Sequence, residues 1–449
     1  MDKLLYFFIA FFLLSKNFAQ TQEGIPMPAW LDSSVIYEVN VRQYTEKGTF
    51  LEFKKHLPRL KKMGIDILWF MPVYPISKIK RKGSLGSYYS IASYLEVNEE
   101  FGSSEDFRSV VNEAHQLGMK VILDWVPNHT GWSHPWIQSH ADWYTKDPAT
   151  DTIIHAAGTD WFDVADLNYE NKNMRIEMIR SMLYWLDTYN VDGFRCDVAM
   201  MVPDDFWLQF SRNVRSMNKS IFMLAEAEES QHRNRGLFHA DYGWTFQNLI
   251  HEIANGTKSA IDFVKYIEED SNKFEKGFHM YFTTNHDENS WKGTEFETLG
   301  SAHQLFSALT FVLDGIPLIY SGQEEPLKKR LRFFDKDTIG FKNFVCESFF
   351  KNLITLRKNN PALYAGSSGG KINWIETDVN KNILAFKRTK DQNEVICFFN
   401  LSEENQTTKI KSKDLNSEYI EFNSKKKQKL SEGTRFKLNS WEYKIFIKE

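Results

Sequence analysis

The chain has 449 residues, a formal net charge of −4 and an isoelectric point near 6.3. This nearly balanced charge excludes the strongly basic composition typical of proteins that bind nucleic acid or anionic membrane surfaces, so we expect neither partner. The length predicts two or three domains. Three widely spaced cysteines do not make a disulfide framework, and we expect all three to be small buried residues: Cys196, Cys346 and Cys397.

The N-terminus has the pattern of an export signal. Lys3 supplies a positive charge, an apolar stretch runs from Leu4 to Leu14, and Ala19 offers a small-residue cleavage point. The apolar stretch is shorter than the ~20 residues of a membrane span, which disfavours the alternative of a retained anchor helix. Residues 1–20 are therefore predicted to be a signal peptide. The protein is expected in the periplasm or outside the cell, with no membrane association after signal removal.

From residue 35 onward, apolar strand-like runs alternate with segments of helical periodicity, among them 50–63, 104–117 and 204–217. Such strand–helix units predict a parallel sheet covered by helices, and eight units close into an α/β protein of the (β/α)₈ TIM barrel type. An eighth strand is expected within 237–244. The seven visible strands are 35–41, 67–72, 120–124, 191–195, 221–226, 279–284 and 315–320.

Two further segments have a different pattern. Residues 130–173 are rich in Trp, His and Asp and lack helical periodicity, which predicts a small loop subdomain after the third strand, above the barrel mouth. Short alternating runs predict a C-terminal all-β sandwich over residues 366–449. The (β/α)₈ barrel, including the loop subdomain, is thus expected over residues 21–365.

Charged residues close two consecutive predicted strands. Arg195 and Asp197 end one strand and Glu226 ends the next, so a barrel would place them side by side at one rim. Retaining cleavage of a glycosidic bond needs two carboxyl groups about 5–5.5 Å apart, one as nucleophile and one as acid. Strand alternation places Arg195 on the face of Asp197, where we expect it to keep that carboxylate ionised. The apolar residues before Glu226 are expected to raise its pKa and keep it protonated.

A third carboxylate and two histidines extend this group. Asp287 can accept hydrogen bonds from sugar hydroxyls, and His129 and His286 can donate to them. A single Asp at a strand end is more often a cap for the next helix, and Asp124 is open to that interpretation or to an internal contact with Arg195. The sequence contains no His-Glu-x-x-His motif and no cysteine pair that would indicate zinc.

The order of these motifs resembles the α-amylase superfamily of retaining glycoside hydrolases, over essentially everything after the signal segment. The resemblance implies Asp197 as nucleophile, Glu226 as acid and base, and Asp287 as the carboxylate that stabilises the transition state. The matching segments are 124–129, 165–168, 193–197, 224–226, 284–287 and 317–323. Any one of them is a weak signal, whereas six in the same order are specific.

The same resemblance implies further site residues. Tyr89 matches the family's tyrosine that stacks on the sugar ring, and the neighbouring Tyr88 is the alternative. The family's calcium-binding loop after the first strand is rich in Asp, whereas 42–48 has one acid and a Lys, so we expect no calcium there. A second family site implies a metal ligand at Asn128, where calcium is the candidate ion, with Asp160, Asp163 and Asp166 as open partners. No cofactor is required. The implied substrate contacts are Tyr89, His129, Arg195 and His286.

Together these observations predict a retaining hydrolase that cleaves α-1,4-glucosidic bonds of maltooligosaccharides or starch fragments by double displacement. The alternatives are an α-glucosidase, a sucrose-type hydrolase or a glucan transglycosylase of the same superfamily, because loops set specificity. Residues 199–201, Ala-Met-Met, stand where many amylases carry Lys-His after the nucleophile. The specificity for the leaving part of the substrate is therefore not predicted. A non-catalytic glucan-binding relative is disfavoured, since all three acid positions are filled. Endo or exo attack and oligomeric state are not predicted.

Overall fold

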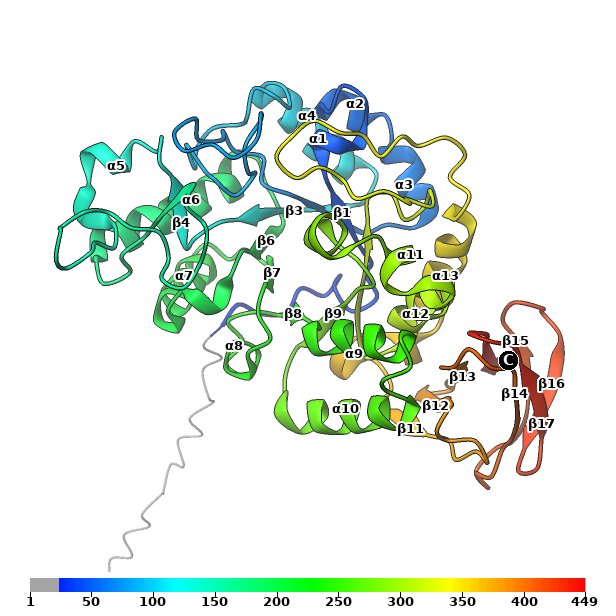
Figure 1. Cartoon of the computed structure of the whole chain (residues 1–449). Helices are drawn as coiled ribbons and strands as arrows, with labels where there is room; N and C mark the ends of the chain where they lie inside the picture. Colours follow the sequence, from blue (N-terminus) through cyan, green and yellow to red (C-terminus); the bar gives the residue numbers. More distant parts are fainter. Residues whose placement is uncertain (1–23, 449) are drawn as a thin grey trace, which may run out of the picture.

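The computed structural model describes residues 24–448, and its centre is a closed barrel of eight parallel strands in the order β1-β10-β9-β8-β7-β6-β3-β2 (Figure 1). The strands are β1 (Ile36–Val39), β2 (Ile67–Phe70), β3 (Lys120–Trp125), β6 (Gly193–Cys196), β7 (Phe222–Ala225), β8 (Ala240–Tyr242), β9 (Phe278–Tyr281) and β10 (Gly315–Tyr320). The predicted (β/α)₈ barrel is confirmed, and the eighth strand lies where it was expected. The predicted signal peptide, 1–20, lies outside the described residues.

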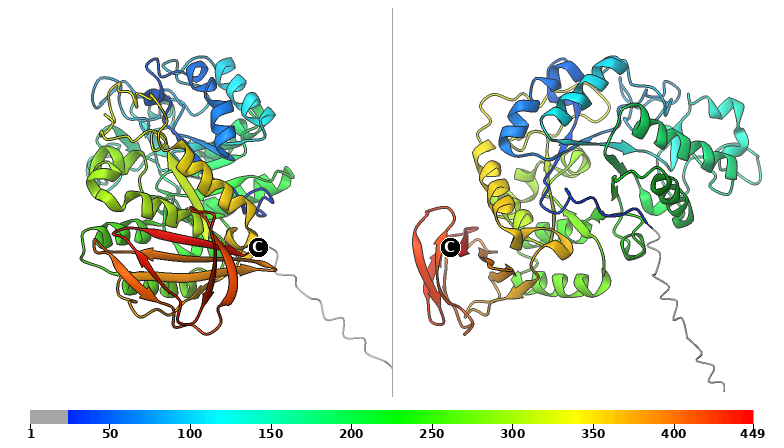
Figure 2. Two further views of the ribbon diagram at one scale, coloured as in Figure 1. Left: turned by 90° about the vertical axis from the view of Figure 1, so that its right-hand side faces the viewer. Right: turned by 180° about the vertical axis from the view of Figure 1, so that it is seen from behind.

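Helices surround the barrel on its outer side (Figures 1 and 2). They include α2 (Phe50–Lys54), α3 (Leu57–Met63), α4 (Ser104–Gln116), α6 (Lys172–Thr188), α7 (Asp204–Ser216), α9 (Trp244–Ala254), α10 (Ala260–Lys273), α12 (His303–Val312) and α13 (Glu347–Asn359). Short turns of helix follow several strand ends: α1 (Val41–Tyr44), α8 (Ser230–Asn234), the π-helix η3 (Glu288–Lys292) and α11 (Glu295–Thr298). Within the described part, no helix has the length and apolar character of a membrane span.

The single helix predicted over 50–63 is two helices. α2 ends at Lys54 and α3 begins at Leu57, with Pro58 in the first turn of α3. Pro has no backbone N–H, which costs nothing in a first turn but would remove a hydrogen bond in the middle of a continuous helix. The apolar periodicity extends across this break, which is why the pattern alone predicted one helix.

Side chains along each strand alternate between the barrel interior and the helix layer. On β2, Trp69 belongs to the interior cluster, whereas Leu68 and Phe70 pack beneath the helices. The same alternation turns Arg195 inward, since its neighbours Phe194 and Cys196 belong to the outer cluster. Charged residues at the carboxyl ends of the strands therefore enter the barrel mouth.

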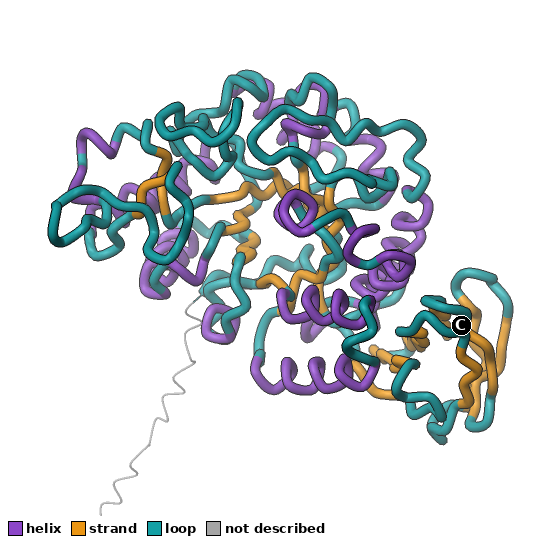
Figure 3. The backbone as a smooth tube through the Cα atoms, in the orientation of Figure 1, coloured by secondary structure: helices purple, strands orange, loops and turns teal. Residues whose placement is uncertain are grey.

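The segment after β3 forms the predicted loop subdomain. Its only paired strands among the described residues are β4 (His129–Gly131) and β5 (Val164–Asp166), which run antiparallel, and one short helix, α5 (Trp136–Ser139), lies at its outer end. Most of the subdomain is loop, as Figure 3 shows, and it projects to one side of the barrel. Because β4 begins only four residues after β3 ends, the subdomain lies directly beside the barrel mouth.

The C-terminal part consists of antiparallel strands, which confirms the predicted all-β domain (Figure 2). One sheet has the order β11-β12-β13-β18-β15-β16, and a second pairs β14 with β17. The strands are β11 (Ile372–Trp374), β12 (Ile383–Lys390), β13 (Asn393–Asn400), β14 (Gln406–Lys409), β15 (Asn416–Glu421), β16 (Lys427–Ser431), β17 (Arg435–Leu438) and β18 (Tyr443–Lys448).

The larger sheet has two apolar faces. On β12, Ile383 and Ala385 belong to a core within the C-terminal part, whereas Leu384 and Phe386 belong to the cluster that continues into the barrel helices. Arg388 follows on this second face and is fully buried. Its guanidinium donates to the carbonyls of Leu313 at 2.6 Å, Tyr364 at 2.7 Å and Gly370 at 2.7 Å. Arg388 thus joins the C-terminal sheet to the segments that follow α12 and α13.

Replacing Arg388 should weaken this junction. Arg388→Met keeps the apolar stem but leaves several buried carbonyls without donors, at a cost of about 1–3 kcal/mol each before relaxation. We expect a clear loss of free energy of unfolding, on the order of 2–4 kcal/mol, in denaturant titrations. The matched control, Arg435→Met on the exposed edge of β17, should change stability by less than about 0.5 kcal/mol. Equal stability of both variants would contradict the proposed role of the junction.

Candidate active site

Three neighbouring strands deliver charged side chains to one place in the barrel mouth. Asp124 on β3 is the direct neighbour of Arg195 on β6, and Cys196 is the direct neighbour of Ala225 on β7. The next residues are Asp197 and Glu226, whose backbone N–H groups still continue the ladder to Trp125 and Cys196. Asp197 and Glu226 therefore occupy adjacent positions, as their places in the sequence predicted.

The guanidinium of Arg195 lies between three carboxylates. Its Nη1 donates to Asp124 Oδ1 at 2.7 Å and to Asp197 Oδ1 at 2.8 Å, and its Nη2 forms an ion pair with Glu226 Oε2 at 3.0 Å. Arg195 and Asp124 are fully buried. The sequence left open whether Asp124 caps the next helix or contacts Arg195, and the structure shows the contact with Arg195.

Burial raises the pKa of both Asp197 and Glu226. For Glu226 the value rises to about 7, because burial and the neighbouring Asp197 and Asp287 outweigh the attraction of Arg195. This is the direction expected from the apolar strand. For Asp197 the pKa rises to about 6, although we expected Arg195 to hold it low. The physical reason is that one guanidinium serves three carboxylates inside a water-poor site, so its charge only partly offsets the burial of each.

Val198 holds the carboxyl group of Glu226 by its backbone. Its N–H donates to Glu226 Oε2 at 2.7 Å. To do so, Val198 adopts the left-handed conformation, with φ 36° and ψ 47°. A β-branched residue in this region carries strain of roughly 1–2 kcal/mol. The strain is located at the turn between Asp197 and the next helix, where it fixes Glu226 relative to Asp197.

A second charged group surrounds His286. Its Nδ1 contacts Glu38 Oε1 at 2.5 Å, and its Nε2 lies 2.7 Å from the Tyr89 hydroxyl and 3.3 Å from Asp287 Oδ2. Burial alone would lower the pKa of His286, but the charges of Asp287 and Glu38 raise it well above its ordinary value. The imidazole is therefore a cation that donates from both nitrogens. The Tyr89 hydroxyl, which accepts from it, donates in turn to Asp124 Oδ2 at 3.0 Å.

Asp287 differs from the other two carboxyl groups in its protonation. Burial opposes its ionisation, but the charge and hydrogen bond of His286 and the charge of Arg195 outweigh burial and lower its pKa. Asp287 is thus a permanent anion at neutral pH, next to two groups whose pKa values lie near neutrality. The three carboxyl groups therefore differ in pKa, so one can be ionised while another keeps its proton. Acid–base chemistry in one site requires this difference.

Five of the site residues named from the sequence line one cavity of about 540 Å³: Tyr89, His129, Asp197, Glu226 and Asp287. Arg195 and His286 lie beneath it and contact its walls. Burial lowers the pKa of His129 to about 4, so its imidazole is neutral and can donate or accept. Tyr88 lies elsewhere, packed on Arg42 and donating to Asn40, so Tyr89 is the tyrosine of the cavity.

Other residues of the site carried no sequence signal that we interpreted. Glu38 at the end of β1 and Tyr242 on β8, which accepts a hydrogen bond from Arg195, could have been found by their inward position on the strands. The remaining cavity residues come from loops and, for Trp291, from the short π-helix η3, where no periodicity exists to indicate direction. They include Lys82, Asp163, Trp161, Trp291, Phe333 and Phe334.

One carboxylate lies beside the Asn128 side chain, where the family resemblance implies a calcium ligand. This side chain lies 3.4 Å from Asp166 Oδ1 and 3.3 Å from the ring of His129, whereas Asp163 is paired with Lys82 at 2.9 Å. Calcium takes six to eight oxygen ligands, which include backbone carbonyls and water, so calcium at Asn128 stays a prediction. Among the described residues, one group of three side chains has the spacing of metal ligands, and it does not include Asn128. The group consists of Glu228, Asp270 and His279.

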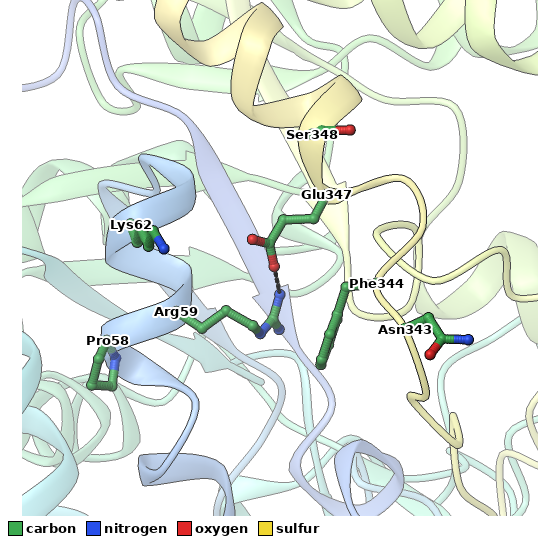
Figure 4. Close-up of a pocket in the computed structure, with 7 residues that line it drawn as sticks. All are labelled: Pro58, Arg59, Lys62, Asn343, Phe344, Glu347 and Ser348. Atoms are coloured by element: carbon green, nitrogen blue, oxygen red, sulfur yellow. Dashed lines mark hydrogen bonds and ion pairs between the residues drawn. The ribbon is translucent and has the colours of Figure 1, made fainter.

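A second cavity, of about 550 Å³, shares no lining residue with the first (Figure 4). It lies between α3 and the start of α13 and is crossed by the ion pair of Arg59 with Glu347, at 3.0 Å. Arg59 also pairs with buried Glu324 at 2.9 Å and lies over the ring of Phe344. The Arg59 guanidinium is thus occupied by contacts within the protein, so we assign this second cavity a structural role.

Comparison with known proteins identifies the family. The model of the alpha amylase catalytic domain matches residues 12–400, so the chain belongs to the α-amylase family and is a glycoside hydrolase of the amylase type. Alpha-amylase MalA of Haloarcula japonica is 25% identical over 403 residues, which cover 85% of this chain and 57% of that protein. Alpha-amylase 3 of Dictyoglomus thermophilum is 23% identical over 86% of this chain and 89% of its own length.

Solved structures agree over nearly the whole chain. The noncanonic maltogenic alpha-amylase AmyB from Thermotoga neapolitana has a TM-score of 0.83 and 26% identity, covering 92% of this chain and 98% of its own. An alpha-amylase from Lactobacillus plantarum has a TM-score of 0.81 and 27% identity, covering 93% and 99%. The barrel and the C-terminal β domain therefore both have counterparts in this family.

The raised pKa of Glu226 predicts an unusual stability effect. Its ordinary pKa is 4.5 and its folded value about 7, so between these values the folded state retains a proton that the unfolded chain releases. Stability is therefore lost as pH rises through this window. Glu226→Gln, which stays neutral, should be more stable than the parent by on the order of 1–3 kcal/mol at pH 8, with little difference at pH 4.

Denaturant titrations at the two pH values measure this effect. The control Glu229→Gln, whose side chain lies outside the cavity, should show no such pH-dependent gain. A Glu226→Gln variant that is less stable than the parent at pH 8 would contradict the assigned burial of this charge.

Proposed function

We propose that this chain is an exported retaining hydrolase that cleaves α-1,4-glucosidic bonds of maltooligosaccharides or starch fragments. The observation that carries the proposal is that Asp197 and Glu226, one on each terminal nitrogen of Arg195, line the same cavity. The relatives named alpha-amylase and maltogenic amylase support the choice of substrate. Export rests on the signal pattern of residues 1–20.

The first half of the reaction uses both carboxyl groups. The Asp197 carboxylate attacks the anomeric carbon, and the bond from that carbon to the leaving oxygen breaks. Glu226 transfers its proton to the leaving oxygen, so the departing sugar leaves as a neutral alcohol. Oε2 of Glu226 already accepts from the Val198 amide and lies on Arg195, so the transferable proton resides on Oε1. Asp197 then holds the sugar as a covalent ester.

The second half reverses the roles. The Glu226 carboxylate takes a proton from water, and the water oxygen attacks the anomeric carbon, breaking its bond to Asp197. The sugar leaves with its original anomeric configuration, and both carboxyl groups return to their starting states. Asp287 and the His286 cation remain charged throughout and can bind ring hydroxyls, while Tyr89 offers an aromatic face to the sugar ring.

Substitution of the two carboxyl groups tests these roles. Asp197→Asn removes the nucleophile and should lower kcat on maltooligosaccharides by about 10⁴-fold or more. Glu226→Gln removes the acid and base and should lower it by about 10²–10⁴-fold. Reducing-sugar release measures both. The matched control Glu229→Gln, three residues further along the chain, should keep parental activity.

Near-parental turnover by either cavity variant would refute the assigned roles. The stereochemistry is checked on the parent protein by following the anomeric protons of the first product by NMR. A product with inverted configuration would refute the covalent intermediate on Asp197. Sugar transferred to another sugar instead of water would favour the transglycosylase alternative, and activity confined to sucrose would favour the sucrose-type one.

The pKa values of the two groups predict the pH dependence. Activity should rise as Asp197 ionises, with a pKa of about 6, and fall as Glu226 loses its proton, with a pKa of about 7. The profile of kcat/KM should therefore be a narrow bell with its maximum between these values. Initial rates on maltotriose from about pH 4 to about pH 9 provide the measurement. A profile that is flat across this range would contradict the assignment.

A further inference from the structure

Building on the proposed function, we propose that this enzyme attacks its glucan from the non-reducing chain end, because the glycone end of its cavity is closed. Four loops meet around that end, and the ion pair between Lys82 and Asp163 completes the closure. The substrate class is thus linear α-glucan with a free non-reducing end. Cyclic or end-blocked glucans are excluded.

The ion pair joins two loops that are far apart in the sequence. Lys82 lies in the loop between β2 and α4, and Asp163 lies in the loop subdomain just before β5. Lys82 Nζ is 2.9 Å from Asp163 Oδ1 and donates to the carbonyl of Asp160 at 3.4 Å. The Asp163 side chain is only 5% exposed, whereas that of Lys82 is 34% exposed. Both residues line the active-site cavity, so their contact forms part of its wall.

The wall continues from Lys82 into the loop between β10 and α13. Ser84 donates to the Asp335 carboxylate from both its backbone N–H, at 2.8 Å, and its hydroxyl, at 2.5 Å. Leu85 N–H donates to the carbonyl of Phe334 at 2.9 Å. The ammonium group of Lys82 also lies 5.9 Å from the centre of the Phe334 ring. Two separate hydrogen-bonded contacts therefore hold these loops together.

Aromatic side chains extend this wall to the segment that follows β9. Trp291, on the π-helix that follows Asp287, packs its ring 5.1 Å from that of Phe333 and 5.6 Å from that of Phe334. On the other side of Lys82, the subdomain contributes Trp161, whose ring lies 5.6 Å from His129. The contacts thus run without interruption from the loop after β9 to the strand end that bears His129.

On the side of β6 and β7, the lining residues of the cavity in the described part of the chain are Asp197, Val198 and Glu226. There the cavity is bounded by Val198 and Glu226, and beyond them Met200 and Met201 are 50% and 39% exposed. In the described part of the chain, no hydrogen bond or ion pair joins either Met side chain to the opposite rim. Glu226 must lie beside the leaving oxygen, so the leaving part of the glucan extends over this open, apolar side.

A closed glycone end and an open leaving-group side together determine how a chain can bind. The interior of a long glucan would need room on both sides of Asp197, and the wall through Lys82 and Asp163 occupies one of them. Only a chain end fits, and each cleavage releases a short product from that end. This deduction combines the loop contacts with the role of Glu226 as the acid, on which the proposed function rests.

The experiment compares maltoheptaose, labelled with a fluorophore at its reducing end, with the same sugar carrying a 4,6-O-ethylidene block on its non-reducing glucose. We expect the parent to cleave the open sugar about 100-fold faster or more than the blocked one, and to leave cyclodextrin intact. Chromatography of early products should show a regular loss of short units from the unlabelled end. Comparable rates on both sugars, or early products of random length, would overturn the proposal.

Variants test the ion pair itself. Lys82→Ala and Asp163→Asn each remove the contact from one side and should lower the ratio of open to blocked cleavage by about tenfold or more. Lys78→Ala, an exposed lysine in the same loop, is the matched control and should keep the parental ratio. If the parent discriminates but neither variant lowers the ratio, the ion pair is not the closing contact. If no α-1,4-glucan is cleaved by the parent, the proposed function itself fails, which is a separate outcome.

Discussion

The buried guanidinium of Arg195 is the contact on which the site depends. It joins Asp124, Asp197 and Glu226, which come from three neighbouring strands, and it is fully removed from water. One cation cannot compensate three buried anions, so at least one carboxyl group retains a proton near neutral pH. Glu226, at the end of the apolar β7 strand, has the highest of the three pKa values, about 7, against about 6 for the others. The same excess of negative charge that destabilises the barrel mouth thereby creates an acid beside a nucleophile.

Because the barrel is closed, a chain of hydrogen bonds connects Arg195 and its carboxylates to the ends of β1 and β9. β1 and β10 are neighbours in the sheet, and Glu38 of β1 contacts His286, which follows β9. His286 then connects through the Tyr89 hydroxyl to Asp124, and so to Arg195. Each link is a hydrogen bond in which Glu38, His286 and Asp124 are buried and Tyr89 is partly buried. In such surroundings hydrogen bonds are strong and the loss of a partner is costly. The alternating charges also explain why Asp287 stays ionised while Glu226 does not.

Much of this architecture follows from short-range pattern. The apolar runs located seven barrel strands, and the need for eight in a closed barrel placed the last one within 237–244. Alternation along β6 and β7 placed Arg195, Asp197 and Glu226 at the mouth. Pattern was less informative where a local rule competed with it. The helix predicted over 50–63 is broken before Pro58, and the pKa of Asp197 is raised rather than held low, because its partner Arg195 is shared. The first effect follows from one residue type, Pro, and the second from a contact that only the folded barrel creates.

The sequence by itself determined the fold class, the strand ends that carry chemistry and the family resemblance. These depend on a two-residue strand period and on residues close together in the chain. Only the tertiary structure decided which loops meet. The approach of Lys82 to Asp163, of Leu85 to Phe334 and of Trp291 to Phe333 joins segments that are tens to hundreds of residues apart. Loop residues follow no repeat that reveals their direction, and their contacts arise only when the closed barrel fixes the positions of both loop ends.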